Sequence, residues 1–375
     1  MDKILLGTAI AFIITFAAIP VIIKVSEAKK LFDLPDERKI HLMPIPSLGG
    51  LGIFAGFVIA CLFTIPFDLS AEFQYFMAAA LIIFFLGLKD DIMVISPIKK
   101  FIGQVLAAFI IIYKGGVQIK SMHGFLGVYE LPDFFSLALT YLTVIVIINS
   151  FNLIDGVDGL ASSLGLMTAL VFGIYFYFVG QVAYATLAFV LGGSLLAFLI
   201  FNHSPARIFM GDTGSLLIGL VNAILVIRFI NVADTPTSVF PIEASPAVGF
   251  AILMVPLFDT LRVFSLRILN RRSPFTPDRN HVHHLLLDKG LSHTAITYTC
   301  VGINLLFIGF AYFSREWGCS MLILTMVTVA SAGIAMLYYT KPKPRLFVTG
   351  KFTEEAEIST SKILPLQKKA VLSEE

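Results

Sequence analysis

The chain has 375 residues, of which 57% are hydrophobic and only 14% are charged. Soluble domains carry about 25% charged residues, so this composition excludes an ordinary soluble domain, and the high hydrophobicity excludes a disordered chain. The formal net charge of +2 gives no electrostatic reason to expect nucleic-acid binding.

Apolar runs of about 20 residues, the length that crosses about 30 Å of hydrocarbon, follow one another with short polar connections. The predicted fold is therefore all-α, a polytopic integral membrane protein. The first run is not read as a secretory signal, because the basic cluster follows it instead of preceding it. Eleven runs are predicted to span the membrane, near residues 4–23, 49–66, 72–88, 101–113, 135–150, 160–179, 182–201, 213–230, 246–268, 295–313 and 319–339.

The distribution of lysine and arginine predicts the orientation. With eleven spans and an outside N-terminus, the inside segments hold 22 of the 27 basic residues and the outside segments hold 5. Positive charge accumulates on the cytoplasmic side of membrane proteins, so the C-terminus is expected in the cytoplasm. Residues 1–340 are predicted to form the membrane domain, with its polar loops facing the cytoplasm, and residues 341–375 a flexible cytoplasmic tail.

The first inside segment, residues 24–48, carries Arg38, Lys39 and His41 among prolines and glycines. Further along, Asp90 and Asp91 stand together where the third span ends. Adjacent carboxylates repel each other unless a cation or a proton neutralises them, so the pair suits Mg²⁺ or a base of raised pKa. The alternative is a solvated helix end.

The fifth span ends in a run in which Asn149, Asn152, Asp155 and Asp158 recur every three residues, with glycines after both aspartates. Neighbours at this spacing share a helical face, or face one pocket if the glycines open a loop. Their oxygens could bind a hard cation or a nucleotide. A helix cap beside a glycine turn would explain one aspartate, but not all four polar residues.

Asp212 opens the eighth span between Gly211 and Gly214. It could simply cap that helix. However, a helix N-terminus flanked by glycines is also a ready anion site. A metal-binding aspartate beside such a site fits phosphate chemistry better than capping alone.

The longest inside loop holds His281, His283 and His284 together with Arg272 and Arg279. Three histidines could form a zinc site, but the loop has no cysteine, and guanidinium groups bind phosphate bidentately. Pyrophosphate contact is therefore preferred, with zinc as the alternative. The three cysteines of the chain, Cys61, Cys300 and Cys319, imply neither a disulfide framework nor a metal site.

Carboxylates for a divalent cation and cations for a polyphosphate thus gather on one side of a membrane scaffold. This combination predicts phosphoryl transfer to a lipid-borne acceptor. A transporter or flippase of a lipid-linked or phosphorylated solute is the alternative, although it needs polar groups near the midplane. A lipid phosphatase is a third possibility, but it needs no nucleotide pocket. Asp259, within the ninth span, fits a helix–helix anchor or a catalytic role equally well.

Taken together, the motifs resemble those of the polyprenyl-phosphate N-acetylhexosamine-1-phosphate transferases of glycosyltransferase family 4, in the undecaprenyl-phosphate GlcNAc-1-phosphate branch. The resemblance covers roughly residues 1–340. It is carried by Asp-Asp at 90–91, Asn-x-x-Asn-x-x-Asp-Gly-x-Asp-Gly-Leu at 149–160, Phe-Met-Gly-Asp-x-Gly-Ser at 209–215 and His-x-His-His at 281–284.

The resemblance implies a reaction at the cytoplasmic face of the bacterial inner membrane. UDP-GlcNAc and undecaprenyl phosphate would give undecaprenyl-diphospho-GlcNAc and UMP, with Mg²⁺ as cofactor and Mn²⁺ as a substitute. The product would serve O-antigen (lipopolysaccharide), enterobacterial common antigen or teichoic acid synthesis. The pattern of residues 273–284 favours GlcNAc, while another UDP-N-acetylhexosamine is the alternative donor. Relatives often form homodimers.

The resemblance also assigns roles to residues. Asp90, Asp91 and Asp212 would be catalytic, and the metal ligands would be Asp212, Asp91 and Asp155. The remaining assignments are to substrate binding, by Asn149, Asn152, Asp155, Asp158, Arg38, Lys39, His41, Arg272, Arg279, His281, His283 and His284. Many relatives extend the first pair to Asp-Asp-x-x-Asp, whereas Val94 stands at the fifth position here, which makes a third carboxylate ligand at that point doubtful.

Overall fold

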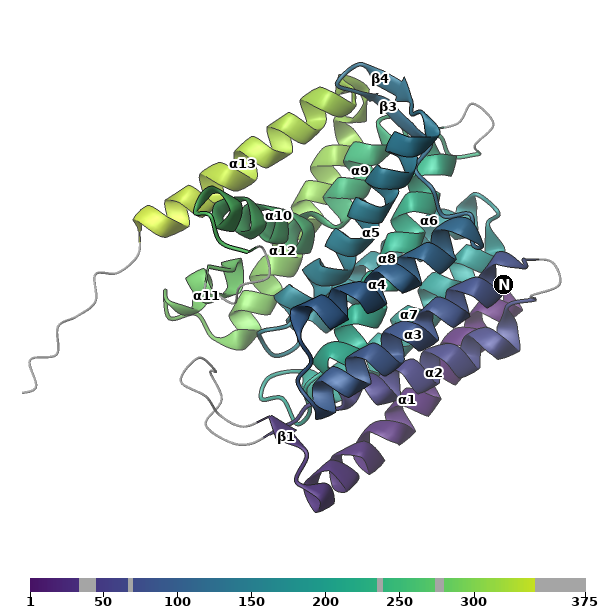
Figure 1. Ribbon diagram of the computed structural model, residues 1–375, viewed down its shortest axis with the longest axis vertical. Coiled ribbons are helices and arrows are strands. Elements are labelled where there is room, and N and C mark those ends of the chain that lie inside the picture. The colour runs from purple at the N-terminus through teal and green to yellow at the C-terminus, as the bar shows by residue number, and fades with distance from the viewer. Residues whose placement is uncertain (34–44, 67–69, 235–238, 274–279, 341–375) are drawn as a thin grey trace, which may run out of the picture. The chain divides into compact units, whose positions relative to one another are not determined.

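The computed structural model describes residues 1–33, 45–66, 70–234, 239–273 and 280–340. Most of this part of the chain is helical (Figure 1), which confirms the predicted all-α class. The α-helices are α1 (Asp2–Lys29), α2 (Gly49–Thr64), α3 (Glu72–Ile92), α4 (Pro97–Tyr113), α5 (Asp133–Ile154), α6 (Leu160–Phe178), α7 (Val182–Asn202), α8 (Gly211–Ala233), α9 (Ser245–Ile252), α10 (Met254–Leu269), α11 (Val282–Leu287), α12 (His293–Phe313) and α13 (Cys319–Tyr339). A short 3₁₀ turn, η1 (Arg315–Trp317), joins the last two.

Each predicted apolar run coincides with a helix, or in one case with a pair of helices. Within the described ranges, seven helices are long and apolar enough to cross a membrane, namely α1, α5, α6, α7, α8, α12 and α13. The number is eight if α9 and α10 form one broken span. The other three runs correspond to α2, α3 and α4, of which α2 has only 16 residues. The protein is therefore a polytopic helical membrane protein.

Two small antiparallel sheets join the helices, and the sequence did not lead us to expect either. β1 (Phe32–Asp33) pairs with β2 (Ile45–Pro46), with Phe32 opposite Pro46. β3 (Ser121–Phe125) and β4 (Val128–Glu130) form a hairpin between α4 and α5. The hairpin contacts the last helix, because the Leu126 amide donates to Ser320 Oγ of α13 at 2.7 Å.

The ninth apolar run, expected as one continuous span, is instead broken into α9 and α10, whose axes differ by 89°. Pro256 lies at the start of α10 and has no N–H to continue the helical ladder. Asn304 of α12 compensates for the break. Its Oδ1 accepts from the Val255 amide at 2.8 Å, and its Nδ2 donates to the Ile252 carbonyl at 3.0 Å. A side chain of a neighbouring helix thus satisfies the freed backbone groups, as a broken helix in a membrane requires.

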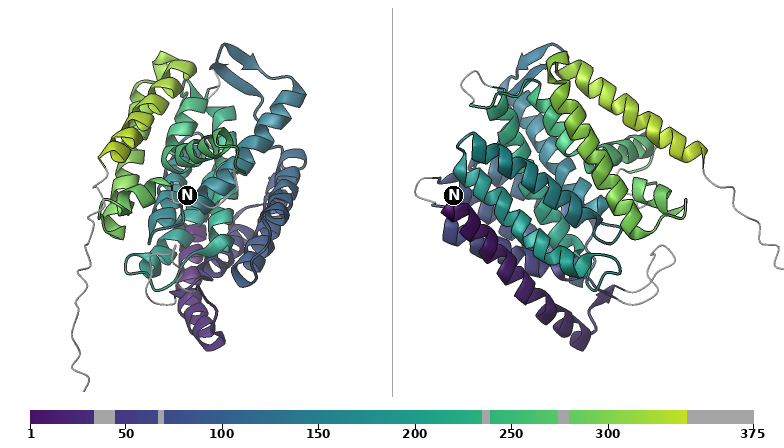
Figure 2. Two further views of the ribbon diagram at one scale, coloured as in Figure 1. Left: turned by 60° about the vertical axis from the view of Figure 1, so that its left-hand side comes forward. Right: turned by 180° about the vertical axis from the view of Figure 1, so that it is seen from behind.

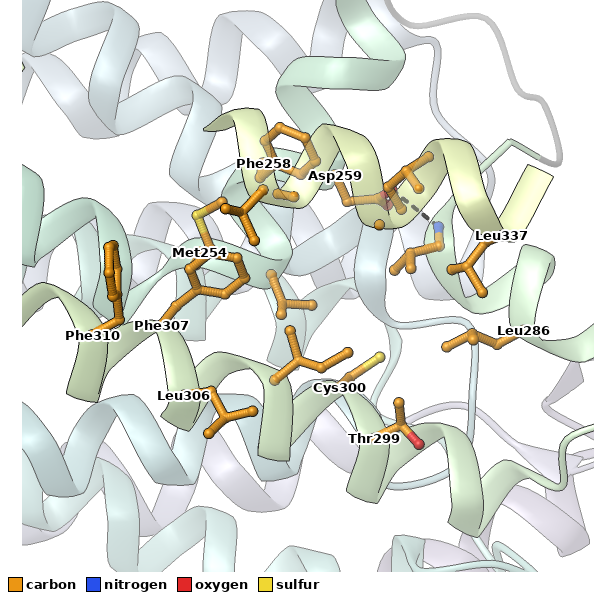
Figure 3. Close-up of a pocket in the computed structure, with 17 residues that line it drawn as sticks. Met254, Phe258, Asp259, Leu286, Thr299, Cys300, Leu306, Phe307, Phe310 and Leu337 are labelled. Carbon is orange, nitrogen blue, oxygen red and sulfur yellow. Dashed lines mark hydrogen bonds between the residues drawn. The ribbon is translucent and has the colours of Figure 1, made fainter. Parts of the chain in front are cut away.

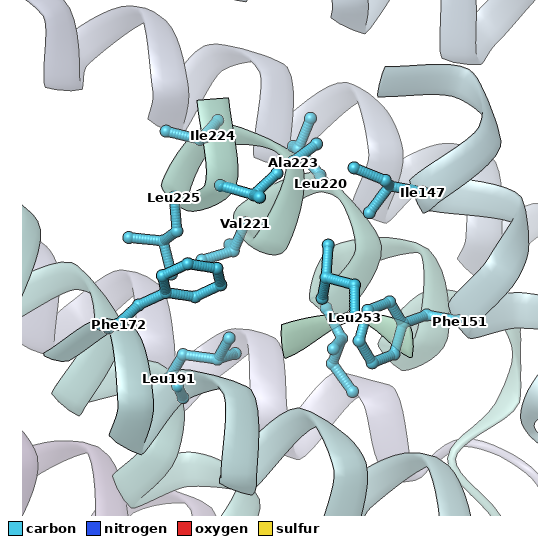
Figure 4. Packing of buried hydrophobic residues seen from close by; sticks show 14 of the residues in the cluster. Ile147, Phe151, Phe172, Leu191, Leu220, Val221, Ala223, Ile224, Leu225 and Leu253 are labelled. Carbon is cyan, nitrogen blue, oxygen red and sulfur yellow. The ribbon is translucent and has the colours of Figure 1, made fainter. Parts of the chain in front are cut away.

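The core of the molecule is built around α8. Figure 4 shows side chains of α5, α6 and α7, such as Phe151, Phe172 and Leu191, packed around those of α8. The helices α5 and α8 approach closely at Gly219, where a Cβ atom would lie 2.5 Å from the Cα of Ile148. Within a bilayer the hydrophobic effect does not drive helices together, and small residues at helix crossings allow the two backbones to pack tightly. The aspartate at the start of α8 therefore stands on a rigid element.

The first and last described helices lie on opposite sides of the bundle (Figures 1 and 2). The most apolar 18-residue stretch of α13 is 11% buried inside the protein, compared with 83% for that of α8. Exposed apolar side chains such as Leu324 and Met336 cover the outer side of α13. A helix that is apolar on its exposed side is suited to contact with lipid.

Candidate active site

The backbone just before α8 is held by β2 and by the start of α2. The Phe209 amide donates to the Pro46 carbonyl at 2.7 Å, and the Gly49 amide donates to the Phe209 carbonyl at 2.9 Å. Gly211 has a φ of +71°, and a Cβ there would lie 2.2 Å from the Ser47 carbonyl oxygen. Only glycine fits this position without strain. The glycine before Asp212 is therefore explained by the backbone conformation at the start of α8.

Asp91, at the end of α3, caps α8. Its Oδ1 accepts from the Asp212 amide at 2.7 Å, and its Oδ2 accepts from the Thr213 amide at 3.0 Å and the Thr213 hydroxyl at 2.5 Å. A carboxylate at a helix N-terminus satisfies free N–H groups and complements the helix dipole. Close packing of Gly87 on Thr213 brings the two helices together. Asp91 therefore fixes the backbone from which Asp212 projects.

Lys100, in the first turn of α4, joins the acidic residues. Its Nζ forms an ion pair with Asp212, lies 3.2 Å from Asp90 Oδ2, and donates to Asn152 Oδ1 at 3.2 Å. Asp90 is oriented in turn by the Ile95 amide, which donates to its Oδ1 at 2.7 Å. We refer to Asp90, Asp212, Lys100 and Asn152 as the acid–lysine cluster. It unites the end of α3 and the start of α4, which are close in the sequence, with the distant end of α5 and start of α8.

The sequence reasoning missed Lys100. Basic residues are ordinary on the cytoplasmic side of a membrane protein, and Lys89, Lys99 and Lys100 looked alike in that respect. The helix dipole disfavours a cation in the first turn of a helix, but Lys99 and Lys100 both stand in the first turn of α4, so this signal would not have separated them.

The asparagines at the end of α5 have different surroundings. Asn152 Nδ2 donates to Asp212 Oδ1 at 2.6 Å and to Ser215 Oγ at 3.0 Å. Asn149, one turn earlier, is buried and donates to Gln104 Oε1 of α4 at 2.8 Å. In the structure, Asn152 belongs to the acid–lysine cluster, whereas Asn149 links α4 to α5 behind it.

The loop after α5 carries the two remaining aspartates of that motif. Burial and the nearby charges of Asp212, Asp91 and Asp158 raise the pKa of Asp155 to about 8. A carboxyl group surrounded by negative charge gains from a bound cation. Asp158 is buried, accepts from the Ala206 amide at 3.2 Å, and lies 3.2 Å from His293 Nδ1 at the start of α12. Asp158 therefore also ties the loop to neighbouring segments.

The predicted histidines lie on the other side of this loop, in and before α11. The rings of His281 and His283 stack in parallel with centroids 5.7 Å apart. His283 packs against Gly156, where a Cβ atom would lie 2.5 Å from its Nε2. Burial lowers the pKa of His283 to about 3, so this ring stays neutral. The fold thus brings the motif at residues 149–160 into contact with the motif at residues 281–284.

No group of three or more His, Cys, Asp or Glu side chains able to hold a metal ion occurs in the described ranges. The zinc alternative for the histidines thus finds no support there. A hard cation here would need Asp90 and Asp212 together with amide oxygens and oxygens of a substrate, a combination that Mg²⁺ uses.

Of the remaining predicted residues, Arg38, Lys39, His41 and Arg279 fall outside the described residues. Arg272 is exposed after the end of α10. Val94 is 96% exposed, so its side chain lies away from the acid–lysine cluster.

An apolar cavity of about 530 Å³ lies between α10, α11, α12 and α13. Figure 3 shows its lining, with Phe307 and Leu306 on α12 and Leu337 on α13. Among the described residues of the lining, Asp259 is the charged one, and it is also hydrogen-bonded to His281. The cavity therefore adjoins the histidine end of the site.

Comparison with known proteins agrees with this geometry. Residues 73–230 match the sequence profile of glycosyl transferase family 4. The chain is 33% identical over 362 residues to decaprenyl-phosphate N-acetylglucosaminephosphotransferase of Mycobacterium tuberculosis, covering 89% of this chain and 88% of the relative. It is 33% identical over 302 residues to a probable undecaprenyl-phosphate N-acetylglucosaminyl 1-phosphate transferase of Bacillus subtilis, covering 78% and 81%. The corresponding Escherichia coli K12 transferase is 30% identical over 312 residues, covering 80% and 83%.

Proposed function

Because this chain belongs to glycosyl transferase family 4, among its polyprenyl-phosphate N-acetylglucosamine-1-phosphate transferases, we propose that it transfers GlcNAc-1-phosphate from UDP-GlcNAc to undecaprenyl phosphate. The products are undecaprenyl-diphospho-GlcNAc, a first membrane intermediate of envelope polysaccharide synthesis, and UMP. The observation that carries this proposal is the acid–lysine cluster, in which Asp90, Asp212 and Asn152 converge on the Lys100 ammonium.

The oxygens of this cluster fit a Mg²⁺ ion. Two carboxylates and a carboxamide oxygen already surround one positive charge, which is the chemistry that a hard cation requires. Asp212 and Asp90 would hold the ion with oxygens of the donor diphosphate, and Asp155 would lie near enough to assist. Mg²⁺, or Mn²⁺ in its place, supplies charge neutralisation at the diphosphate.

Asp91 has a different part in this proposal from the one that the resemblance implies. Both of its oxygens already accept hydrogen bonds from the first turn of α8. Asp91 would therefore act by holding Asp212 in place rather than as a principal ligand.

The reaction is a direct displacement. An oxygen of the lipid phosphate forms a bond to the β-phosphorus of UDP-GlcNAc, the bond from that phosphorus to the bridging oxygen breaks, and UMP leaves with that oxygen. Lys100 supplies positive charge to the phosphoryl oxygens, where such preorganised groups contribute most to catalysis. Asn152 holds Asp212, and Asp155 and Asp158 line the adjoining loop for the nucleotide.

The site would face the cytoplasm in the bacterial inner membrane. The ends of α3 and α5 and the starts of α4 and α8 meet at the acid–lysine cluster. These are the inside ends in the arrangement of eleven spans with an outside N-terminus, which accounts for 22 of the 27 basic residues. A cytoplasmic face also gives access to a soluble nucleotide sugar.

The apolar cavity beside Asp259 is suited to part of the acceptor's isoprenoid chain. Its lining is almost wholly apolar, and its volume of about 530 Å³ lies in the range of sites that hold small ligands. Contact between Asp259 and His281 connects the cavity with the phosphate-binding end of the site.

UMP release by detergent-purified protein tests the proposed function. The protein would be given undecaprenyl phosphate and a panel of UDP-sugars. We expect UMP only when the lipid is present and UDP-GlcNAc is the donor. Release from another UDP-N-acetylhexosamine would keep the reaction and change the donor, whereas no release from any donor by folded protein would overturn the proposal.

A further inference from the structure

Asp259 is a buried acid that takes no part in the proposed displacement. It lies on α10, just after the break from α9, and is 3% exposed. Its Oδ2 lies 2.8 Å from His281 Nδ1, and its Oδ1 accepts from the Val282 amide at 3.0 Å, the contact drawn in Figure 3. A helix–helix anchor would explain one such contact, but here both oxygens are committed to the start of α11.

Arg262, one turn further along α10, completes the arrangement. It donates to Asp259 Oδ1 at 2.8 Å and also to the Asn280 carbonyl oxygen. The guanidinium group thus balances the charge of the buried carboxylate, which would otherwise be costly. It also holds the backbone just before His281. Because Arg262 already provides the counter-ion, His281 is not needed for that purpose.

The contact with Asp259 determines how His281 can act. A carboxylate can only accept, so His281 Nδ1 carries the proton, and Nε2 is the nitrogen left for another partner. The His281 ring is stacked on His283, and His283 packs on Gly156 beside Asp155. The carboxylate of α10 is therefore connected, through two imidazole rings, to the loop assigned to the nucleotide.

We propose that Asp259 is a positioning residue for phosphoryl transfer, which fixes the tautomer and orientation of His281 so that Nε2 binds an oxygen of the donor diphosphate. This inference rests on the proposed function. A carboxylate that orients a histidine through Nδ1 is a recurrent arrangement in both metal and hydrolase sites. An asparagine at the same place would retain the shape but could hold the ring in the wrong tautomer.

A double-mutant cycle with Asp259→Asn and His281→Ala tests the inference through kcat for UMP release. We expect Asp259→Asn to lower kcat about 10- to 100-fold, as the loss of such orienting groups does, with a change of less than about threefold in KM for UDP-GlcNAc. In the His281→Ala background the same substitution should cost less than about threefold, because coupled residues are not additive.

The structural control is Asn304→Ala, at the break between α9 and α10. Its loss of activity should multiply with that of His281→Ala, because the hydrogen bonds of Asn304 run to the break between α9 and α10, whereas that of His281 runs to Asp259. Multiplicative losses for Asp259→Asn would overturn the inference, as would full activity of His281→Ala. If Asp259→Asn fails to fold, Asp259→Glu enters the same cycle and is read by the same criteria.

A second measurement does not depend on activity. Nitrogen-15 NMR of histidine-labelled protein should show His281 protonated on Nδ1 in the wild type, and a changed pattern in Asp259→Asn. An unchanged His281 signal would overturn the positioning role. Wild-type protein that releases no UMP yet shows this signature would instead disprove the proposed function and leave the Asp259–His281 contact established.

Discussion

The acid–lysine cluster and the cavity side of the molecule, formed by α10 to α13, are built in opposite ways. The cluster stands at the N-terminal end of α8, and the most apolar 18-residue stretch of that helix is 83% buried. Hydrogen bonds and ion pairs from α3, α4 and α5 hold the side chains of the cluster. The cavity side ends in α13, in which the corresponding stretch is only 11% buried, and it encloses an apolar space. The charged groups of the cluster thus stand on a deeply buried helix, whereas the cavity side ends in a helix that is largely exposed.

Removal of divalent metal should give the largest effect, because the proposed ion would be held at the acid–lysine cluster. We expect a chelator to reduce UMP release to background and Mg²⁺ or Mn²⁺ to restore it. The Mg²⁺ concentration for half-maximal activity should fall as the pH rises towards about 8, since Asp155 must lose its proton before it can assist a cation. Metal-independent UMP release would contradict the assignment of the cluster.

Lys100→Met comes next. It removes the cation between Asp90 and Asp212, and we expect kcat to fall about 10²- to 10³-fold, as when other preorganised electrostatic groups are lost. The matched control is Lys99→Met, an exposed neighbour on the same turn of α4, which should change activity less than about twofold. Equal effects of the two substitutions would mean that Lys100 contributes only general positive charge.

Asp91→Asn separates the positioning of Asp212 from metal binding. The loss of the charged cap on α8 should lower the free energy of unfolding by about 1 kcal/mol, measured by chemical denaturation of the purified protein. It should also reduce kcat without changing the Mg²⁺ concentration for half-maximal activity. A tenfold increase in that concentration would restore Asp91 as a principal metal ligand.

The cavity side should give the smallest effect. Gly333 lines the cavity, and a Cβ atom there would meet nothing within 4 Å, so Gly333→Phe should fill space rather than disrupt packing. We expect KM for undecaprenyl phosphate to rise about three- to tenfold, with KM for UDP-GlcNAc unchanged. The control is Met336→Phe, on the exposed side of the same helix. An unchanged lipid KM would remove the isoprenoid chain from this cavity.

The sequence predicts features that depend on neighbouring residues and not those that depend on distant partners. Long apolar runs reveal helices directly, and all eleven runs are helical. The break at Leu253 is hidden because hydropathy is continuous across it, and the compensating Asn304 lies 51 residues further along the chain. The roles of Lys100 and Asp259 are hidden for the same reason. Each depends on partners brought together only by the fold, since Asp259 meets His281 across 22 residues and Lys100 meets Asp212 across 112.

Within the motifs, the sequence identified polar residues of the site but not the contact that each of them makes. Regular spacing suggested one shared helical face, or one shared pocket, for the polar residues at the end of α5. In the structure, Asn152 contacts Asp212 while Asn149 pairs with Gln104. The spacing could not separate them, because the partners of each lie on a different helix.

The most direct measurement is UMP release by purified Asp212→Asn, which keeps the size of the side chain and removes its charge. Asp234→Asn, at the far end of the same helix, is the matched control, and thermal unfolding confirms that both variants are folded. We expect Asp212→Asn to lose at least about 10³-fold in kcat, with Asp234→Asn within about twofold of the wild type. Lipid-dependent UMP release by folded Asp212→Asn at the wild-type rate would contradict the assignment of the acid–lysine cluster as the centre of phosphoryl transfer.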